Sequence, residues 1–346
     1  MIVRARAPLR LGLAGGGTDL SPYCDEYGGA VLNSTIDRYA YAFIEPSPDR
    51  LLHFVARDLG IEERLEPGEA ALAQARLAIH AGVWRRMAAL APGLAPLRVT
   101  TYVDAPAGSG LGSSSALVVA LVEAFRTRLG LPLGLYDVAR LAFEVERVDL
   151  ALAGGKQDQY AAAFGGANFI EFLAHDRVIV NPLRIPRGFV NELEASLVIC
   201  FSGVSRRSEA IIEDQQRHMA GHDAAAIESL HQLKSDAVEM KQALLRGEIR
   251  DMAAILNRSW DAKKRTASGV SSPAIDRLHE TAMAHGALAG KVSGAGGGGF
   301  VMFLTPPEDR IALIRALNAT GDPAAGAQAS AVHFTSQGAE SWVVPA

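Results

Sequence analysis

Apolar residues recur most regularly in the stretch that follows residue 116. Leu117, Leu121, Phe125 and Leu129 stand four residues apart, and most of the residues between them are also apolar. Four-residue steps place these side chains on one side of a helix, and the apolar residues between them predict that the helix is buried. Gly130 follows directly and is typical of a helix end.

Strands and further helices are predicted on both sides of this helix. Alternating or continuous apolar runs predict strands at residues 2–13 (one strand or a short hairpin), 31–44, 51–54, 97–103, 168–172, 195–201, 300–304 and 331–335. Helical patterns cover residues 69–91, 135–152, 209–217, 223–246, 248–258 and 275–285, and one more helix follows Pro306.

The length of the chain predicts two domains. A chain of 346 residues exceeds the size at which one hydrophobic core usually stops growing. Residues 183–194 are rich in proline, glycine and charge, so we place the boundary there, with domains at residues 1–190 and 191–346.

The composition is typical of a soluble globular enzyme, with 49% apolar and 21% charged residues. A net charge of −4 gives no basic field for nucleic acid or acidic membranes, so bound phosphates would need local positive charge. The apolar runs are too short for a membrane span, and the first residues do not resemble a signal peptide. Two cysteines without paired Cys/His spacing fit a reducing cytoplasm.

Residues 105–112, which we call the first glycine loop, alternate glycines with small residues just before the buried helix. Glycine allows close approach of the backbone to a ligand, and the first N–H groups of a helix attract anions. The serines at 113–115 can bond phosphate oxygens or bind a metal. The segment lacks the lysine of a Walker A motif and does not fit Gly-x-Gly-x-x-Gly. The alternative interpretation is a flexible turn before a helix.

Three other segments combine glycines with polar residues. Residues 15–19 read Gly-Gly-Gly-Thr-Asp, and residues 154–160 place a polar cluster after two glycines. Asp19 and Asp158 are candidate functional acids, although each could instead cap the start of a short helix. Residues 293–299, the second glycine loop, contain four consecutive glycines, which predict close backbone approach to a ligand or a neighbouring loop.

Taken together and in this order, residues 8–19, 106–116 and 291–299 resemble the three signature motifs of the GHMP small-molecule kinases, among them galactokinase, mevalonate kinase and homoserine kinase. The Gly-Gly-Gly-Thr-Asp form and the residues Gly-Lys-Gln-Asp-Gln-Tyr at 155–160 are similar to the subgroup of sugar 1-kinases that act on heptose 7-phosphate. The resemblance implies an α/β (α+β) fold with a ribosomal-S5-like N-terminal domain, a ferredoxin-like C-terminal domain and an active site between them.

The resemblance also implies roles for individual residues. Asp158 matches the family's catalytic aspartate, and Arg10 matches an arginine near the transferred phosphoryl group. Ser114 and Glu146 would bind Mg²⁺. The residues expected to bind the ATP phosphates, or to support them from the second domain, are Pro106, Gly108, Ser109, Gly110, Leu111, Gly112, Ser113, Ser114, Gly294, Gly296 and Gly297.

The expected acceptor site departs from the galactokinase pattern. Gly16 and Gly17 stand where galactokinases carry a Glu-His pair, which argues against galactose and leaves room for a larger sugar such as a heptose. Thr18 and Asp19 would face sugar hydroxyls. A sugar phosphate also needs a cation, and arginine suits phosphate through bidentate donation. The candidates, in order of preference, are Arg206 and Arg207, then Lys156, then Lys263 and Lys264.

The implied activity is ATP- and Mg²⁺-dependent phosphorylation of the anomeric C1 hydroxyl of D-glycero-D-manno-heptose 7-phosphate. The 1,7-bisphosphate formed would serve surface polysaccharide such as capsule or lipopolysaccharide. We expect a cytoplasmic enzyme without nucleic-acid or membrane partners, and the choice between monomer and homodimer stays open. One alternative is a kinase for an unphosphorylated sugar such as L-fucose. Another is a non-catalytic sugar or nucleotide sensor, against which the joint presence of Ser114, Glu146 and Asp158 argues.

Overall fold

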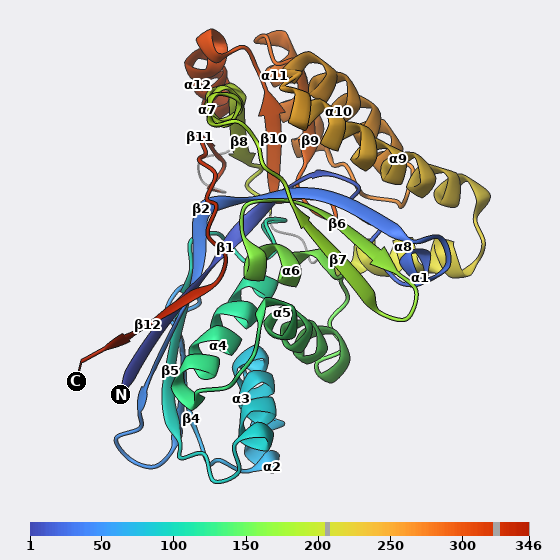
Figure 1. The fold of residues 1–346 in the computed structure, drawn as a ribbon. Coiled ribbons are helices and arrows are strands. Elements are labelled where there is room, and N and C mark those ends of the chain that lie inside the picture. Colours follow the sequence, from blue (N-terminus) through green and yellow to red (C-terminus); the bar gives the residue numbers. More distant parts are fainter. Residues whose placement is uncertain (205–207, 321–325, 346) are drawn as a thin grey trace.

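Two β-sheets organise the chain in a computed structural model that describes residues 1–204, 208–320 and 326–345 (Figure 1). The first sheet has eight strands in the order β12-β1-β2-β5-β3-β4, with β6 and β7 extending from β2. Its strands are β1 (Ile2–Ala14), β2 (Gly29–Pro46), β3 (Leu52–Ala56), β4 (Ile61–Leu65), β5 (Leu97–Val103), β6 (Ala167–Leu173), β7 (Arg177–Pro182) and β12 (Glu340–Val344).

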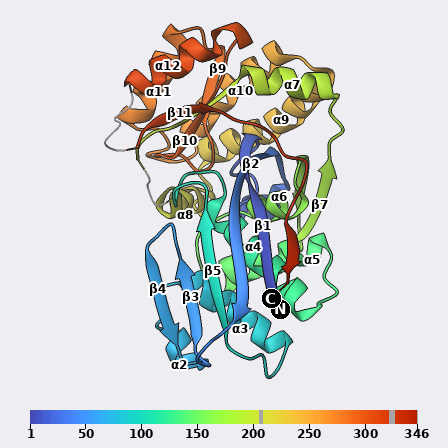
Figure 2. The ribbon, with the colours of Figure 1, turned by 90° about the vertical axis from the view of Figure 1, so that its left-hand side faces the viewer.

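Helices from the first half of the chain cover one face of this sheet. Figure 1 shows α3, α4 and α5 on one side of the strands, and Figure 2 shows the strands from the other side. The helices of this half are α1 (Tyr23–Tyr27), α2 (Glu69–Leu72), α3 (Ala78–Leu90), α4 (Ser113–Leu129), α5 (Leu135–Phe143), the π-helix Glu144–Asp149 and α6 (Gln157–Phe164).

The second sheet has four antiparallel strands in the order β11-β8-β10-β9. They are β8 (Leu197–Phe201), β9 (Ala289–Val292), β10 (Phe300–Leu304) and β11 (Gln328–Ala331). Numbered within this half the order is 4-1-3-2, with helices after the first and third strands, which confirms the expected ferredoxin-like arrangement. The remaining helices are α7 (Arg187–Ser196), α8 (Ser208–Ala220), α9 (Ala224–Arg246), α10 (Ile249–Lys264), α11 (Pro273–Ala284), the 3₁₀ helix Pro307–Asp309 and α12 (Arg310–Thr320).

The last described strand returns to the first sheet. Strand β12 pairs antiparallel with β1, so the two ends of the chain lie side by side (Figures 1 and 2). The proposed boundary between residues 190 and 191 falls inside α7, just before the second sheet begins. A single boundary did not anticipate the return of β12, and the division into two domains at this point stays a proposal.

The two halves meet on the second part of β1. Near its start the strand alternates, with Val3 and Ala5 buried and Arg4 and Arg6 not, as expected for a sheet with one open face. From Ala7 onwards every residue of β1 is buried, because α4 and α6 from the first half and α9 and α10 from the second all contact this strand. The glycine-rich residues 15–19 follow directly, so they lie at the junction of the two halves.

Several elements differ from the sequence-based prediction. The predicted helix at residues 69–91 is divided, because the Glu63 carboxylate accepts hydrogen bonds from the backbone of Arg76 and Leu77, both at 2.9 Å, at the start of α3. The helix at 135–152 ends at residue 149, and its last turn is a π-helix. Strands β4, β7, β9 and β12 were not predicted, and the strand expected at 331–335 lies at Gln328–Ala331.

We predict that Gly338→Ala lowers the free energy of unfolding by about 1–3 kcal/mol, the usual cost of overpacking. A Cβ atom at this position would lie 2.2 Å from the Ala163 carbonyl oxygen, so the segment leading into β12 could not keep its place against α6. Urea denaturation would measure the loss. Gly188→Ala is the matched control, since its Cβ would meet nothing within 4 Å. Equal stability of the two variants would contradict the prediction.

Candidate active site

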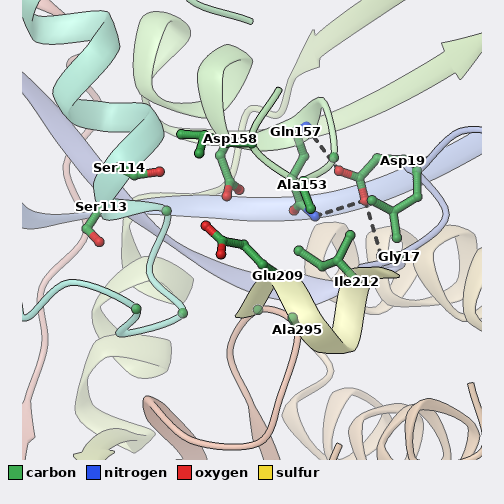
Figure 3. A pocket seen from close by; sticks show the side chains of 18 of the residues that line it. Gly17, Asp19, Ser113, Ser114, Ala153, Gln157, Asp158, Glu209, Ile212 and Ala295 are labelled. Atoms are coloured by element: carbon green, nitrogen blue, oxygen red, sulfur yellow. Dashed lines mark hydrogen bonds between the residues drawn. The ribbon is translucent and has the colours of Figure 1, made fainter. Parts of the chain in front are cut away.

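A cavity of about 460 Å³ opens between the two halves of the chain. This volume is within the range usual for small-molecule sites. Figure 3 shows Ser113 and Ser114 at one end, Asp158 in the middle, and Asp19 with Gly17 at the other end. Glu209 and Ile212 of α8, together with Ala295 of the second glycine loop, close the side that faces them.

The first glycine loop leads directly into the buried helix α4. Gly108, Gly110 and Gly112 all have positive φ values of 71–76°, which L-residues with a side chain rarely adopt. Gly112 occupies the N-cap position of α4, so Ser113 and Ser114 begin the helix and line the cavity. The unpaired N–H groups of this first turn point to an anion site at this end of the cavity.

The second glycine loop packs against the first, backbone to backbone. A Cβ atom at Gly110 would lie 2.2 Å from the Ser293 carbonyl oxygen, and one at Gly299 would lie 2.4 Å from the Ser109 carbonyl oxygen. The Phe300 N–H donates to the same Ser109 oxygen at 2.8 Å. The consecutive glycines therefore serve close approach to a neighbouring loop, which was one of the two alternatives predicted for them.

Not every residue predicted for the phosphate site lines the cavity. Gly108, Gly110, Gly112, Ser113, Ser114 and Gly294 do so. Ser109 and Leu111 are fully buried and shape the loop from within. Gly297 donates its N–H to the Val270 carbonyl oxygen, and a Cβ atom at Gly296 would strike the same oxygen. Five of the residues predicted for the phosphate site lie outside the cavity lining and contribute to the shape of the two loops: Pro106, Ser109, Leu111, Gly296 and Gly297.

Arg10 and Asp158 form an ion pair at the centre of the cavity, in which Arg10 is buried and Asp158 is partly exposed. The Arg10 guanidinium contacts Asp158 Oδ1 through Nε at 2.7 Å and through Nη2 at 2.6 Å. Its remaining nitrogen donates to the Gly110 carbonyl oxygen at 2.7 Å and to the Ser293 hydroxyl at 3.3 Å. Both contacts to Asp158 use Oδ1, and within the described residues no hydrogen bond reaches Oδ2. The aspartate is thus fixed with one oxygen open to a ligand.

Glu146 lies behind the start of α4 with its side chain fully buried. Its carboxylate accepts hydrogen bonds from the hydroxyls of Ser114 and Ser115 and from Gln159 Nε2, the last two at 2.7 Å. It belongs to the π-helix Glu144–Asp149, a rare conformation that is frequent at functional sites. The structure therefore brings together Ser114 and Glu146, the two residues predicted to bind a metal.

Arg147 fixes the loop that connects Glu146, one of the predicted metal-binding residues, to the far end of the cavity. It donates to the carbonyl oxygens of Leu152, Ala153 and Gly155 at 3.3–3.4 Å. A Cβ atom at Gly154 would lie 2.2 Å from the Arg147 guanidinium carbon. Arg147 lines the cavity. Sequence reasoning missed its role, although it directly follows Glu146.

Asp19 lies at the far end and is held rigidly. Its carboxylate accepts from the N–H of Gly17, from the N–H of Gln157 and from Gln157 Nε2, each at 3.1 Å. Gly155 must lack a side chain, because a Cβ atom there would lie 1.9 Å from Asp19 Oδ2. The two glycines at 154 and 155 thus admit Arg147 on one side and Asp19 on the other.

The structure corrects the role predicted for Thr18 in the acceptor site. Thr18 is fully buried and outside the cavity lining, because its hydroxyl bonds the carbonyl oxygens of Gly15 and Ala30 and accepts from the Ala30 N–H. Thr18 therefore shapes the loop and does not face a sugar. Gly17 lines the cavity, whereas Gly16 contributes only a carbonyl oxygen that accepts from Lys263.

The predicted cation sites also need correction. Lys156 is buried outside the cavity lining, where its ammonium pairs with Asp176 at 2.7 Å and with Asp25 at 3.5 Å. Arg206 and Arg207 lie outside the described residues. The lysine that does line the cavity is Lys263 of α10, a residue that the sequence ranked low because clusters of basic residues are usually solvated.

Two buried lysines support residues 12–17 from the second half. Lys263 Nζ donates to the Gly16 carbonyl oxygen at 3.0 Å, and Lys291 Nζ donates to the Gly12 carbonyl oxygen at 2.8 Å. Burial lowers the pKa of Lys263 to about 8, although Asp19 opposes the shift. Burial and the nearby cations of Lys263 and Arg10 lower the pKa of Lys291 to about 7. Positive charge is thus concentrated at the junction.

Comparison with known proteins agrees with this geometry. The sequence models for the GHMP kinases N terminal domain and the GHMP kinases C terminal domain match residues 78–166 and 240–323. A D-glycero-alpha-D-manno-heptose 7-phosphate kinase of Campylobacter jejuni is 41% identical over 98% of both chains. The chain belongs to the GHMP kinase family.

Other relatives of this GHMP kinase support the same assignment. A crystal structure described as a D-glycero-D-manno-heptose 1-phosphate kinase from Bacteroides thetaiotaomicron superposes with a TM-score of 0.81 at 40% identity, over 99% of this chain and 100% of that one. An L-fucokinase/L-fucose-1-P guanylyltransferase of Bacteroides fragilis is 24% identical over 91% of this chain and 36% of its own length. No helix within the described ranges is long and apolar enough to cross a membrane.

We predict that the two buried lysines make this GHMP kinase more stable as the pH rises from about 7 towards 10. Their folded pKa values, about 7 and about 8, lie below the ordinary value of 10.5, so across this window the unfolded chain binds more protons. The contribution of these two lysines to the free energy of unfolding therefore increases with pH. Lys291→Met should flatten the rise measured by urea denaturation at pH 7 and pH 9.

Lys264→Met is the control for this prediction. Lys264 is adjacent to Lys263 but partly exposed, and it pairs with Asp261 at 2.9 Å. This variant should keep the pH dependence of the wild-type protein. Parallel pH profiles for Lys291→Met and the wild type would contradict the role given to Lys291.

Proposed function

We propose that this GHMP kinase transfers the γ-phosphoryl group of ATP to the anomeric C1 hydroxyl of D-glycero-D-manno-heptose 7-phosphate, forming the 1,7-bisphosphate. The observation that carries the proposal is the position of Asp158. Held by Arg10 at 2.6–2.7 Å, it lies between the first glycine loop, which suits phosphates, and Asp19, which suits sugar hydroxyls. A carboxylate in this place can act on an acceptor hydroxyl that faces the end of the triphosphate.

The choice of acceptor rests on the two relatives of about 40% identity. The names of both contain a phosphorylated D-glycero-D-manno-heptose. They differ in the phosphate position, since one names a 7-phosphate and the other a 1-phosphate. We favour the 7-phosphate as substrate, because residues 15–19 and 155–160 resemble the sugar 1-kinases that act on heptose 7-phosphate, and the relative of 41% identity is named for that substrate. The position of the new phosphate is the feature that an experiment must determine.

The residues around the cavity divide the work of phosphoryl transfer. Amides of the first glycine loop and the first turn of α4 would bind the triphosphate, and Ser113 and Ser114 would add hydroxyl donors. Arg10 would lie beside the γ-phosphoryl group and balance the charge that develops on it. Asp158 Oδ2 would accept or orient the proton of the C1 hydroxyl. The sugar oxygen then forms its bond to the γ-phosphorus, and the bond to the leaving ADP oxygen breaks.

Ser114 and Glu146 fit Mg²⁺ as a partner of the nucleotide. In the described part of the chain no group of three or more acidic, histidine or cysteine side chains is arranged for a metal. One carboxylate and one hydroxyl beside an anion site are what Mg²⁺ commonly takes from a protein, with water and phosphate oxygens completing its shell. When bound, the ion would neutralise charge on the β- and γ-phosphates.

A sugar panel with ATP tests the proposal. The wild-type enzyme should consume ATP with heptose 7-phosphate and not with L-fucose or unphosphorylated heptose. Phosphorus NMR of the product should show one new phosphate, bonded to C1. Turnover with L-fucose at similar kcat/KM would favour a kinase for unphosphorylated sugars, and absence of turnover with any sugar would favour a sensor.

We predict that Asp158→Asn lowers kcat by at least 10²-fold, the lower end of the usual range of roughly 10²–10⁴ for general base catalysis. The amide keeps the shape of the side chain but cannot take the proton. The affinity for ATP should stay close to that of the wild type, because the asparagine amide fills the same space beside Gly112 and its oxygen can still accept from Arg10. Coupled ADP release and nucleotide titration would measure the two effects separately.

Asp176→Asn serves as the control for Asp158→Asn. Asp176 is an exposed carboxylate that pairs with Lys156 outside the cavity lining. Its left-handed backbone, with φ of 53°, suits asparagine. This variant should keep wild-type kcat. Near wild-type turnover in Asp158→Asn would refute the assigned role.

A further inference from the structure

Lys263 places a cation at the end of the cavity that faces away from the first glycine loop. Its Nζ donates to the Gly16 carbonyl oxygen at 3.0 Å, and a Cβ atom at Gly17 would lie 3.1 Å from the same nitrogen. Figure 3 shows Gly17 and Ser114 at opposite ends of the cavity, with Asp158 between them. The ammonium therefore lies across the proposed reaction centre from the site of the ATP phosphates.

The charge of Lys263 is incompletely satisfied by the protein. The bond to Gly16 is its single side-chain hydrogen bond within the described residues, although an ammonium has three donors. The residue is 5% exposed. The carboxylate whose charge acts on it is that of Asp19, which already accepts three hydrogen bonds from Gly17 and Gln157. A buried ammonium without a carboxylate partner is costly, and an anionic ligand in the cavity would remove that cost.

The other buried lysines do not share this arrangement. Lys156 pairs with two carboxylates, and Lys291 donates to the Gly12 carbonyl oxygen, and neither lines the cavity. Arg10 and Arg147 do line it, but the Arg10 guanidinium holds Asp158, and that of Arg147 donates to the carbonyl oxygens of Leu152, Ala153 and Gly155. Arg10 pairs with Asp158 and Arg147 with Glu146, so within the described residues Lys263 is the cavity-lining cation that forms no ion pair with a carboxylate.

We infer that Lys263 binds a phosphate group that the acceptor sugar already carries, at the carbon most distant from the hydroxyl that reacts. The inference rests on the proposed function and deepens it. With the reacting hydroxyl at Asp158, the sugar extends towards Gly17, and a phosphate on its last carbon reaches the ammonium. An acceptor without that phosphate would leave the Lys263 charge buried and unpaired, so the site selects for a sugar monophosphate.

The role of Lys263 requires a residue without a side chain at position 17. The φ of Gly17, 106°, is rarely adopted by residues with a side chain, and any Cβ atom would press on the Lys263 ammonium. The same space is lined by Gln215, which is held by a 2.7 Å bond from its Nε2 to the Thr266 hydroxyl. The loss of a side chain at position 17 therefore makes room for a cation supplied by α10 of the second half.

Lys263→Met tests the inference, because methionine keeps most of the volume and removes the charge. Calorimetry in the presence of a non-hydrolysable ATP analogue would compare the binding of heptose 7-phosphate with that of unphosphorylated heptose. We expect the affinity for the phosphorylated sugar to fall about 10- to 100-fold, as for the loss of charge-assisted hydrogen bonds. The affinity for the unphosphorylated sugar and the KM for ATP should change less than about threefold, within the usual scatter of such contacts.

Two further variants complete the design. Lys264, also a predicted phosphate cation, lies outside the cavity lining, is partly exposed and pairs with Asp261. Lys264→Met is therefore the matched control, and it should bind both sugars like the wild type. Lys263→Gln keeps an amide donor for the Gly16 carbonyl oxygen and still removes the charge, so it serves if Lys263→Met does not fold. Thermal unfolding of each variant establishes that it is folded.

The outcomes separate the inference from the proposed function. If Lys263→Met and Lys263→Gln lose affinity for the phosphorylated and the unphosphorylated sugar equally, or keep the affinity for both, the inference fails. Turnover by the wild type would still uphold the proposed reaction. If the wild type binds heptose 7-phosphate through Lys263 without turning it over, the inference stands and the reaction fails. If the wild type does not bind heptose 7-phosphate, both are overturned.

Discussion

The buried guanidinium of Arg10 is the interaction on which the arrangement of the site depends. From strand β1 it reaches Asp158 at the start of α6, the Gly110 carbonyl oxygen of the first glycine loop and the Ser293 hydroxyl of the second. A buried guanidinium is tolerated only when its donors are paired, so these three segments stabilise one another through a single side chain. The position of the proposed catalytic aspartate and the shape of the loop that faces the nucleotide are therefore coupled.

Local motifs were enough to predict much of this site. The glycines before α4 indicated an anion site from their conformational freedom, and the resemblance of the surrounding residues indicated Asp158, Arg10, Ser114 and Glu146. In the structure the first three line one cavity, and Glu146 lies buried behind Ser114, whose hydroxyl donates to it. The order of the strands in the second half also followed from the family. These predictions rest on short motifs whose residues are contiguous in sequence: a loop, the start of a helix and the end of a strand.

The failures share a different cause, because each depends on a contact between distant segments. Thr18 turns inward since the backbone of Ala30 offers it both an acceptor and a donor, and Lys156 is neutralised by Asp25 and Asp176. The sequence indicated a surface position for Lys263, whereas in the structure α10 packs over residues 16 and 17. A sequence lists charges but not their partners, and the partner decides whether a lysine is free to bind a ligand.

The pairing of β12 with β1 has a consequence for the synthesis of the chain. Strand β1 is synthesised before the other strands of its sheet, yet one of its two neighbours consists of residues 340–344. While the ribosome is still adding the second half, the outer edge of β1 lacks its partner and offers unpaired N–H and C=O groups to other nascent chains. Completion of the first sheet must therefore wait until residues 340–344 have been synthesised.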